Sequence, residues 1–354
     1  MSTLSASTEH RDSRPQGLRS ASRKVPPIVW AAVIGGLVIA FELFVLGRWV
    51  SGPYLKHVTT GPDVAPAWMR ITFVCWQIGG IVAAGAAFWF FLIRPWVRER
   101  RVTTDGLLVV AFATLWFQDP LSAYFGHWFT YNTNLVNFGS WVNDVPGWQS
   151  YGRPGAMIAE PIALIVPVYV YFIMIGTLLG CAVMRAVRKR WPNTHVLTVV
   201  IACFVAMCLL DVVGEGLVWL PLGFWEYPGG IGPKLFAGTY HQYPLNEMLT
   251  IATIFTGIAC LRYFTDAEGR TIVERGVERF RSSGVRNTLR GLALLGAVHL
   301  ILLLGYNLPN AIVGSLHAAW PQDLVNRSYL TDHLCGPGTK NLCPTKDHGF
   351  IVGR

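Results

Sequence analysis

Charged residues are scarce in this chain of 354 residues, where they make up 14%, against about 25% in ordinary soluble domains. Hydrophobic residues make up 52% of the chain. The formal net charge of +9 could suggest a nucleic-acid partner. However, the cations lie in short segments between long apolar runs, which is the pattern of cytoplasmic loops. The composition therefore indicates an integral membrane protein in a lipid bilayer, with no nucleic acid bound.

The motifs of several chemistries are also missing. The chain has no Walker loop, no GxGxxG, no GxSxG and no NDxxD-type diphosphate site. Phosphate, nicotinamide and acyl-serine chemistry therefore lack support. No CxxC or HxxH pair occurs, so the sequence does not indicate a metal site. We expect neither a metal nor another cofactor.

Seven apolar runs are long enough to cross a membrane, since about 20 residues span its core. They cover residues 28–46, 70–93, 106–125, 157–184, 195–220, 245–264 and 289–307. These runs predict an all-α, polytopic helical membrane protein with about seven transmembrane helices. We expect a disordered basic cytoplasmic tail over 1–27, the transmembrane domain over 28–309 and an extracytoplasmic tail or flap over 310–354.

The basic residues predict the orientation of the helices. Twenty of the 29 Lys and Arg residues lie in the first 27 residues and in 94–105, 185–191 and 262–290. The positive-inside rule then places the N-terminus inside and the C-terminus outside, in a multi-pass protein of the plasma membrane. Residues 265–286 carry alternating charges among apolar side chains and predict an amphipathic helix on the inner membrane surface.

The cysteines fit this orientation. Five of the seven lie in apolar runs and are typical of small core residues. Cys335 and Cys343 lie in the polar tail, where an oxidising face would allow a disulfide between them. Two free thiols are the alternative.

Acidic side chains within membrane segments are costly, and they are usually functional or paired. Those in or beside the apolar runs are Glu42, Asp119, Glu160, Asp211, Glu215 and Glu247. With the N-terminus inside, all six fall in the outer half of the membrane. His127, Tyr240 and His241 lie in loops on that same side.

Other interpretations of these residues stay open. Glu160 and Glu247 are also typical of helix N-termini, where a negative charge is favourable. Glu42 could simply hydrogen-bond a neighbouring helix. His299 is most typical of a buried core histidine.

Asp211 and Glu215 are four residues apart, so they share one helix face. Two carboxyl groups that face an apolar cavity cannot both ionise cheaply. One stays protonated beside the other, which provides an acid and a base for chemistry in which a hydroxyl leaves and another oxygen attacks. We predict Asp211 and Glu215 as the catalytic pair, with Asp119 stabilising charge or orienting a hydroxyl.

The stretch from Leu115 to Trp148 is unusually rich in aromatic and amide side chains. A pocket for a mostly apolar ligand with a few hydroxyls needs both kinds. An interfacial aromatic belt is the alternative. The residues predicted to bind such a ligand are Trp116, Gln118, His127, Trp128, Tyr131, Asn137, Glu160, Tyr240 and Glu247.

Several of these residues carry a family resemblance. Residues 116–120 (WFQDP), Tyr131-Asn132, residues 137–141 (NFGSW) and Pro146-Gly147-Trp148 resemble the AveC-like spirocyclase family of actinobacterial membrane proteins. The acids Asp211, Glu215 and Glu247 are similar to what that family leads us to expect. The resemblance covers about residues 28 to 320.

The resemblance implies polyketide tailoring. The family's namesake closes a spiroketal from a dihydroxy ketone in avermectin assembly and has been linked to dehydration. We therefore expect a cyclase for a polyketide or lipid-like hydroxy ketone. Such apolar substrates are made in the cytoplasm, so they would reach outer-half acids sideways through the bilayer, unless the orientation is reversed.

Two other classes of protein remain. The same acids could relay protons in a transporter or bind a head group in a lipid-binding membrane protein. The absence of an internal repeat weakens the case for a repeat-based transporter. A purely structural membrane partner is least consistent with so many polar intramembrane groups. The sequence does not indicate an oligomeric state.

Overall fold

The computed structural model describes residues 25–124, 126–148, 158–316 and 318–349. Within them lie seven helical segments long and apolar enough to cross a membrane. They are Pro27–Ser51, Ala67–Glu99, Thr104–Ala123, Ile162–Arg190, Val196–Leu222, Leu245–Tyr263 and Ser283–Gly314. This confirms the predicted helical membrane fold. The expected disordered tail, residues 1–27, lies almost wholly outside the described residues.

Three of the spans are single α-helices: α1 (Pro27–Ser51), α5 (Ile162–Arg190) and α8 (Leu245–Tyr263). The other four change helix type along their length. The second consists of α2 (Ala67–Ala87), the π-helical η1 (Phe88–Ile93) and α3 (Arg94–Glu99). The third consists of α4 (Thr104–Leu115) and the 3₁₀ segment η2 (Trp116–Ala123). The fifth consists of α6 (Val196–Asp211), the π-helical η4 (Val212–Trp219) and α7 (Leu220–Leu222). The seventh consists of α9 (Ser283–Leu302), the π-helical η7 (Leu303–Asn307) and α10 (Leu308–Gly314).

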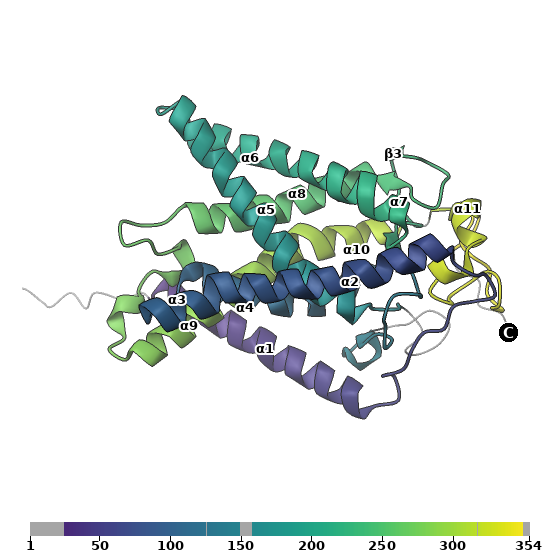
Figure 1. The fold of residues 1–354 in the computed structure, drawn as a ribbon, viewed down its shortest axis with the longest axis horizontal. Coiled ribbons are helices and arrows are strands. Elements are labelled where there is room, and N and C mark those ends of the chain that lie inside the picture. The colour runs from purple at the N-terminus through teal and green to yellow at the C-terminus, as the bar shows by residue number, and fades with distance from the viewer. Residues whose placement is uncertain (1–24, 125, 149–157, 317, 350–354) are drawn as a thin grey trace, which may run out of the picture.

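Close backbone packing joins α1 to α9, which run side by side (Figure 1). A Cβ atom on Gly35 would lie 2.0 Å from the carbonyl oxygen of Leu292, and one on Gly296 would lie 2.6 Å from that of Ala31. Only glycine fits at either place. In a bilayer, where lipid tails are as apolar as the side chains, such small residues let helices associate through backbone contact.

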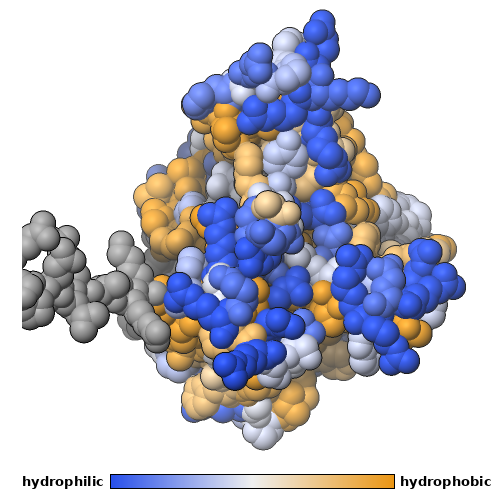
Figure 2. Space-filling view, turned by 90° about the vertical axis from the view of Figure 1, so that its left-hand side faces the viewer, coloured by the Kyte–Doolittle hydropathy of each residue, from blue (hydrophilic) through white to orange (hydrophobic). Residues whose placement is uncertain are grey.

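The two ends of the bundle differ in composition. Figure 2 shows the end that includes the loop before α9, where hydrophilic residues gather, with hydrophobic ones around the sides. Exposed basic residues in the last turns of α3 and α5 and on the connections beside them include Arg98, Lys189, Arg101, Arg279 and Arg281. The positive-inside rule predicts that this end is cytoplasmic.

Residues 265–286 do not form the predicted amphipathic helix. Before α9 begins at Ser283, their regular structure is limited to two 3₁₀ turns, η5 (Ile272–Glu274) and η6 (Val277–Arg279). Gly269 and Gly276 adopt left-handed conformations with φ of 74° and 94°, which interrupt any helix. Buried Glu274 also turns away from the surface to pair with Arg290 at 2.7 Å. The alternating charges serve local ion pairs rather than one helix face.

Two short antiparallel strand pairings lie at the opposite end. Strand β1 (Thr130–Tyr131) pairs antiparallel with β2 (Trp225–Glu226), and β3 (Lys234–Leu235) with β4 (Tyr243–Pro244). A further 3₁₀ turn, η3, covers Val142–Asp144. The first pairing ties residues 126–148, which we call the aromatic segment, to the chain that leaves α7.

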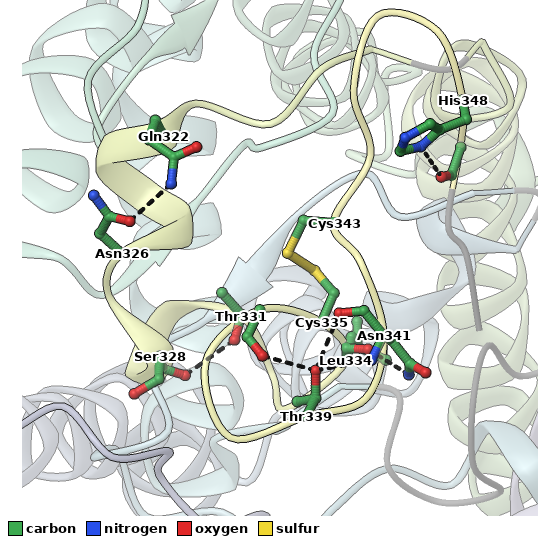
Figure 3. The surroundings of a disulfide bond; sticks show 12 residues. Gln322, Asn326, Ser328, Thr331, Leu334, Cys335, Thr339, Asn341, Cys343 and His348 are labelled. Carbon is green, nitrogen blue, oxygen red and sulfur yellow. Dashed lines mark hydrogen bonds between the residues drawn. A yellow bond between two sulfur atoms is a disulfide. The ribbon is translucent and has the colours of Figure 1, made fainter. Parts of the chain in front are cut away.

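The C-terminal segment packs onto this end. The last long helix continues to Gly314, past the predicted boundary at residue 309. After it come α11 (Gln322–Val325) and the 3₁₀ turn η8 (Ser328–Leu330). Leu324 and Leu330 join the same hydrophobic core as Trp128. Cys335 and Cys343 form a disulfide that closes a turn beside α11 (Figure 3).

Candidate functional site

A cavity lies among η2, α5, η4, α8 and η7, beneath the β1–β2 pairing. It offers about 110 Å³ to the centre of a water molecule, and by this measure one water needs roughly 10–15 Å³. Several waters or a short stretch of a substrate therefore fit. Its polar groups are four carboxyls and four phenols, which are Asp119, Asp211, Glu215, Glu247, Tyr131, Tyr169, Tyr227 and Tyr306. The remaining described lining is aliphatic or aromatic.

The β1–β2 pairing explains which side chains face the cavity from above. Successive side chains of a strand point to opposite faces, and directly opposed residues of an antiparallel pair share a face. Tyr131 lies opposite Trp225, and both line the cavity. Phe129 and Tyr227, two residues away on each chain, line it as well. Local strand geometry thus aims four aromatic side chains at the carboxyl groups.

Asp119 accepts two phenolic hydrogen bonds. Its Oδ2 accepts from the hydroxyl of Tyr131 at 2.7 Å, and its Oδ1 accepts from that of Tyr169 at 2.8 Å. Glu160 is fully buried nearby. Burial raises the pKa of Glu160 well above its ordinary value, and the charge of Asp119 raises it further. Both effects favour the protonated form of Glu160 beside Asp119.

Asp211 and Glu215 line the cavity together, from the end of α6 and from η4. Asp211 Oδ2 accepts from the hydroxyl of Tyr243 at 2.5 Å. Its Oδ1 is buried and has no hydrogen-bond partner among the described residues. Glu215 Oε1 accepts from Trp225 Nε1 at 2.5 Å and from the hydroxyl of Tyr227. The carboxyl groups of Asp211 and Glu215 also lie close enough to interact with each other.

The hydroxyl of Tyr227 bridges two carboxyl groups. It contacts Glu215 Oε1 and also Glu247 Oε1, the latter at 2.8 Å. A phenol has one hydrogen to donate and one oxygen that accepts. For both contacts to be attractive, Tyr227 donates to one carboxyl group while the other is protonated and donates to the phenol oxygen. Hydrogen-bond counting alone thus places one acid and one base in a single relay.

The second oxygen of Glu247 is held from two sides. Glu247 Oε2 accepts from Trp128 Nε1 at 3.2 Å and from Asn310 Nδ2 at 3.1 Å. Asn310 lies in α10 and Trp128 in the aromatic segment. Both partners fix the direction in which Glu247 faces Tyr227.

Two of the π-helical segments carry cavity residues. Glu215 and Trp219 lie in η4, and Tyr306 lies in η7. A π-helical turn carries i to i+5 hydrogen bonds, which shifts the side chains after it, and such turns often occur at functional sites. Gly216 lets Tyr243 approach, since a Cβ there would lie 3.3 Å from the ring of Tyr243.

The site is acidic without a balancing cation. No Lys, Arg or His is among the described residues that line the cavity. Burial raises the pKa values of Tyr131 and Tyr227 well above the ordinary value, and the neighbouring carboxyl groups raise them further. Both phenols therefore stay protonated and act as donors. Such a site can deliver and accept protons, and it favours a cationic intermediate over an anionic one.

The structure brings together five of the residues predicted from the sequence. Asp119, Tyr131, Asp211, Glu215 and Glu247 all line the cavity. Their chemical roles remain a prediction.

Glu160 and Trp128 lie just outside the cavity, against Asp119 and Glu247 respectively. The remaining predicted ligand contacts lie elsewhere. Trp116 packs against Trp141 with ring centroids 4.9 Å apart, and Gln118 donates to His299 Nδ1 at 2.7 Å. His127 pairs with Asp332 at 3.4 Å.

Asn137 and Tyr240 organise loops. Asn137 Oδ1 accepts from the backbone N–H of Val58 at 2.9 Å. Tyr240 donates its hydroxyl to the carbonyl of Pro221 at 2.7 Å. Glu42 also lies away from the cavity residues and pairs with His299 at 3.6 Å. The structure therefore places some of the predicted residues in the cavity lining and the others outside it.

Several cavity residues were missed by sequence reasoning: Tyr169, Tyr227, Trp225 and Tyr306. Tyr169 and Tyr306 lie in apolar runs, where the sequence prediction rests on acidic side chains and on histidine. Tyrosines among the aliphatic residues of a membrane helix are a usable signal, since a buried hydroxyl needs a partner.

Metal binding has no structural support within the described residues, where no three His, Cys, Asp or Glu side chains converge on a possible metal position. A metal-free site remains a prediction.

These observations define a class: a polytopic helical membrane protein with a buried cavity in which carboxyl groups are hydrogen-bonded to tyrosines. The sequence model described as "Spirocyclase AveC-like" matches residues 99–330, a range that contains every described residue lining the cavity. The chain belongs to the AveC-like spirocyclase family, which confirms the resemblance. No curated protein and no solved structure matches the chain.

Proposed function

We propose that the protein is a membrane-embedded cyclase that closes a spiroketal from a polyketide or lipid-like hydroxy ketone. Membership of the AveC-like family implies a cyclase role in polyketide biosynthesis. The specific chemistry and a location in the plasma membrane are proposals. The observation that carries the chemistry is the Tyr227 hydroxyl, which joins Glu215 and Glu247 in one relay facing an apolar cavity.

The reaction needs an acid and a base, but it neither consumes nor releases protons overall. A hydroxyl of the substrate first adds to the ketone and forms a hemiketal. A protonated carboxyl group donates to the hemiketal hydroxyl, which leaves as water, and an oxocarbenium ion remains. The second hydroxyl attacks this carbon and gives its proton to a carboxylate. A dihydroxy ketone thus becomes a spiroketal and one water.

Each turnover leaves the acid deprotonated and the base protonated, so the proton has to return. Tyr227 offers that route, because it can accept a proton from one carboxyl group while it donates its own to the other. Glu215 and Glu247 are the ends of the relay in this proposal. Asp211 would accept the proton of the attacking hydroxyl and pass it to the adjacent Glu215, from which Tyr227 carries it on to Glu247.

The remaining groups would stabilise the cation and exclude water. Asp119 also lines the cavity and accepts hydrogen bonds from two phenols, which keep it in place. The aromatic residues Phe172, Trp219 and Trp225 also line the cavity, and the π-faces of aromatic rings attract cations. Their rigid packing would also bias which face of the oxocarbenium ion is attacked.

The same groups could instead remove water from a β-hydroxy ketone, with a carboxylate taking the proton next to the carbonyl and a carboxylic acid protonating the departing hydroxyl. The choice between closure and dehydration depends on the substrate. Both reactions would use the relay at Tyr227.

The test is direct conversion by the purified full chain in lipid nanodiscs. An achiral dihydroxy ketone with hydroxyls placed to form a spiroketal is supplied, and the enantiomers of the product are separated by chiral chromatography. Spontaneous closure gives equal amounts of both enantiomers, so an excess of one reports catalysis. Glu215→Gln, Glu247→Gln and Asp211→Asn should each lower the rate by about 10²–10⁴-fold, the usual contribution of an acid or base.

Glu278→Gln is the matched control, because Glu278 is exposed and far from the cavity. Wild-type rates in all three cavity variants would remove these carboxyl groups from the mechanism. Proton-coupled flux in proteoliposomes without conversion of any hydroxy ketone would instead favour the transporter.

A further inference from the structure

A second hollow lies on the outer surface of the bundle, between α2 and α5. It offers about 480 Å³ to the centre of a water molecule, which is more than the inner cavity. The described residues that line it are Ile71, Thr72, Cys75, Trp76, Gly79, Gly80 and Ala83 of α2 and Tyr171 of α5. We call it the α2–α5 groove. Its walls are apolar or small, and both helices are membrane-spanning segments.

The groove and the cavity share a wall that is one aromatic contact thick. Trp76 lines the groove, and its ring centroid lies 6.1 Å from that of Trp219, which lines the cavity. The ring centroid of Trp219 in turn lies 4.6 Å from that of Phe172, another cavity residue. Trp76 is held by one polar contact, because its Nε1 donates to the Tyr171 hydroxyl at 3.2 Å.

Space is available in the groove because of its glycines. A Cβ on Gly79 would meet nothing within 4 Å. Gly80 lies against Pro167 and Tyr171 of α5, each 3.4 Å from a Cβ at that position. Small side chains on α2 thus keep open a channel that larger residues would fill.

We propose that the α2–α5 groove holds the apolar body of the substrate, taken from the bilayer, while the hydroxy-ketone end passes Trp76 and Trp219 into the cavity. The proposal rests on the proposed function and names its route of entry. The cavity has room for only a short stretch of a chain, so the rest of an apolar substrate needs a surface outside it. The groove is larger, apolar, open to lipid and separated from the carboxyl groups by Trp76 and Trp219. It also lies mostly on α2, before the residues that the family model matches.

Photochemical labelling tests occupancy without requiring turnover. The probe is a long-chain dihydroxy ketone with a diazirine at the end of its alkyl chain, added to the full chain in phosphatidylcholine nanodiscs. Peptide mass spectrometry should find adducts within residues 71–83 and at Tyr171, and excess unlabelled dihydroxy ketone should displace them. A diazirine phosphatidylcholine that labels the groove equally and is not displaced would show a lipid-filled groove and overturn the proposal.

Gly79→Leu and Gly85→Leu form a matched pair of variants. Both glycines lie exposed on α2 with nothing within 4 Å of a Cβ, but only Gly79 lines the groove. Gly79→Leu should reduce the displaceable label and raise KM, each about tenfold and with an unchanged kcat, because it removes burial of roughly two methylene groups. Gly85→Leu should leave both measurements as in the wild type.

The outcomes separate this proposal from the proposed function. If the wild type converts the ketone and Gly79→Leu keeps the wild-type KM and label, the groove is not the route and the cyclase stands. If the wild type converts no hydroxy ketone, the cyclase proposal fails, and the labelling pattern still decides whether the groove binds the apolar chain.

Discussion

Trp128 donates its indole N–H to Glu247 Oε2 across 3.2 Å, and so joins the aromatic segment after η2 to the first turn of α8. Trp128 is fully buried and does not itself line the cavity. Its partner Glu247 does line the cavity and contacts the Tyr227 hydroxyl. The aromatic segment therefore acts on the site partly by orienting a carboxyl group.

Tyr227→Phe tests the relay without changing the shape of the cavity. The variant removes the hydroxyl that joins Glu215 and Glu247 and leaves both carboxyl groups in place. Conversion of the dihydroxy ketone should fall by at least about 10²-fold, as expected for the loss of positioned proton transfer. Its pH profile should also change shape, which a purely structural role would not cause.

Tyr240→Phe is the control for this substitution, because Tyr240 lies outside the cavity and donates to a backbone carbonyl. An unchanged rate and pH profile in Tyr227→Phe would contradict the relay.

Glu226→Gln should remove a pH dependence of stability. Glu226 is fully buried, and neither carboxyl oxygen has a hydrogen-bond partner among the described residues. Burial raises its pKa well above the ordinary 4.5, while the nearby Arg327 lowers it in part. The folded state thus holds this proton more tightly than the unfolded chain does. The stabilisation is complete below pH 4.5 and is lost as the pH rises towards the folded-state pKa.

Thermal unfolding in detergent, followed from below pH 4.5 upward, measures this effect. The midpoint of the wild type should fall relative to Glu226→Gln as the pH rises. Glu268→Gln, at an exposed glutamate, should behave as the wild type does. Parallel curves for the wild type and Glu226→Gln would refute the prediction.

Removal of the disulfide should destabilise the C-terminal segment. Cys335 and Cys343 are eight residues apart, so the bond closes a short loop, and its chain-entropy contribution is about 2–3 kcal/mol. The double variant Cys335→Ser/Cys343→Ser should unfold at a lower temperature, and a reductant should shift the wild type to the same midpoint.

Cys75→Ser is the control, because Cys75 is a free thiol on the membrane face of α2 and should leave the midpoint unchanged. A wild type that does not respond to the reductant would mean that the bridge does not hold this segment.

The orientation can be measured with two exposed positions at opposite ends of the bundle. Ser282 precedes α9, and Thr60 lies in the connection between α1 and α2. The positive-inside rule predicts that a membrane-impermeant maleimide labels Thr60→Cys from outside the cell and Ser282→Cys only after the membrane is opened. The reverse pattern would invert the topology and place the cavity nearer the cytoplasmic side.

The helical architecture could be predicted from the chain alone, because each span is an apolar run of sufficient length and a bilayer leaves the backbone no alternative to helix or closed barrel. Local structure between the membrane spans was harder to predict from the sequence. Residues 265–286 have the charge alternation of a surface helix, but Gly269 and Gly276 and the buried ion pair of Glu274 override it. The alternation of charges along the sequence describes only one face of a possible helix. The contacts that override it depend on neighbours from α1 and α9.

The candidate site could be predicted in part. Asp119, Asp211, Glu215 and Glu247 stood out because ionisable groups in apolar runs are costly. Polar side chains in the same stretch also indicated a site, namely those of Gln118, His127 and Asn137. In the structure each of them contacts a protein group outside the cavity. Polarity in an apolar run shows that a partner is needed and does not show whether the partner is a ligand or the protein.

The sequence by itself determined that seven apolar segments cross a bilayer and that acids cluster near one set of helix ends, because length, hydropathy and residue order are properties of the chain. Only the tertiary structure decided which of these acids meet. Tyr227 reaches both Glu215 and Glu247 because the β1–β2 pairing folds it back over η4 and the start of α8. That convergence depends on packing between segments far apart in the chain.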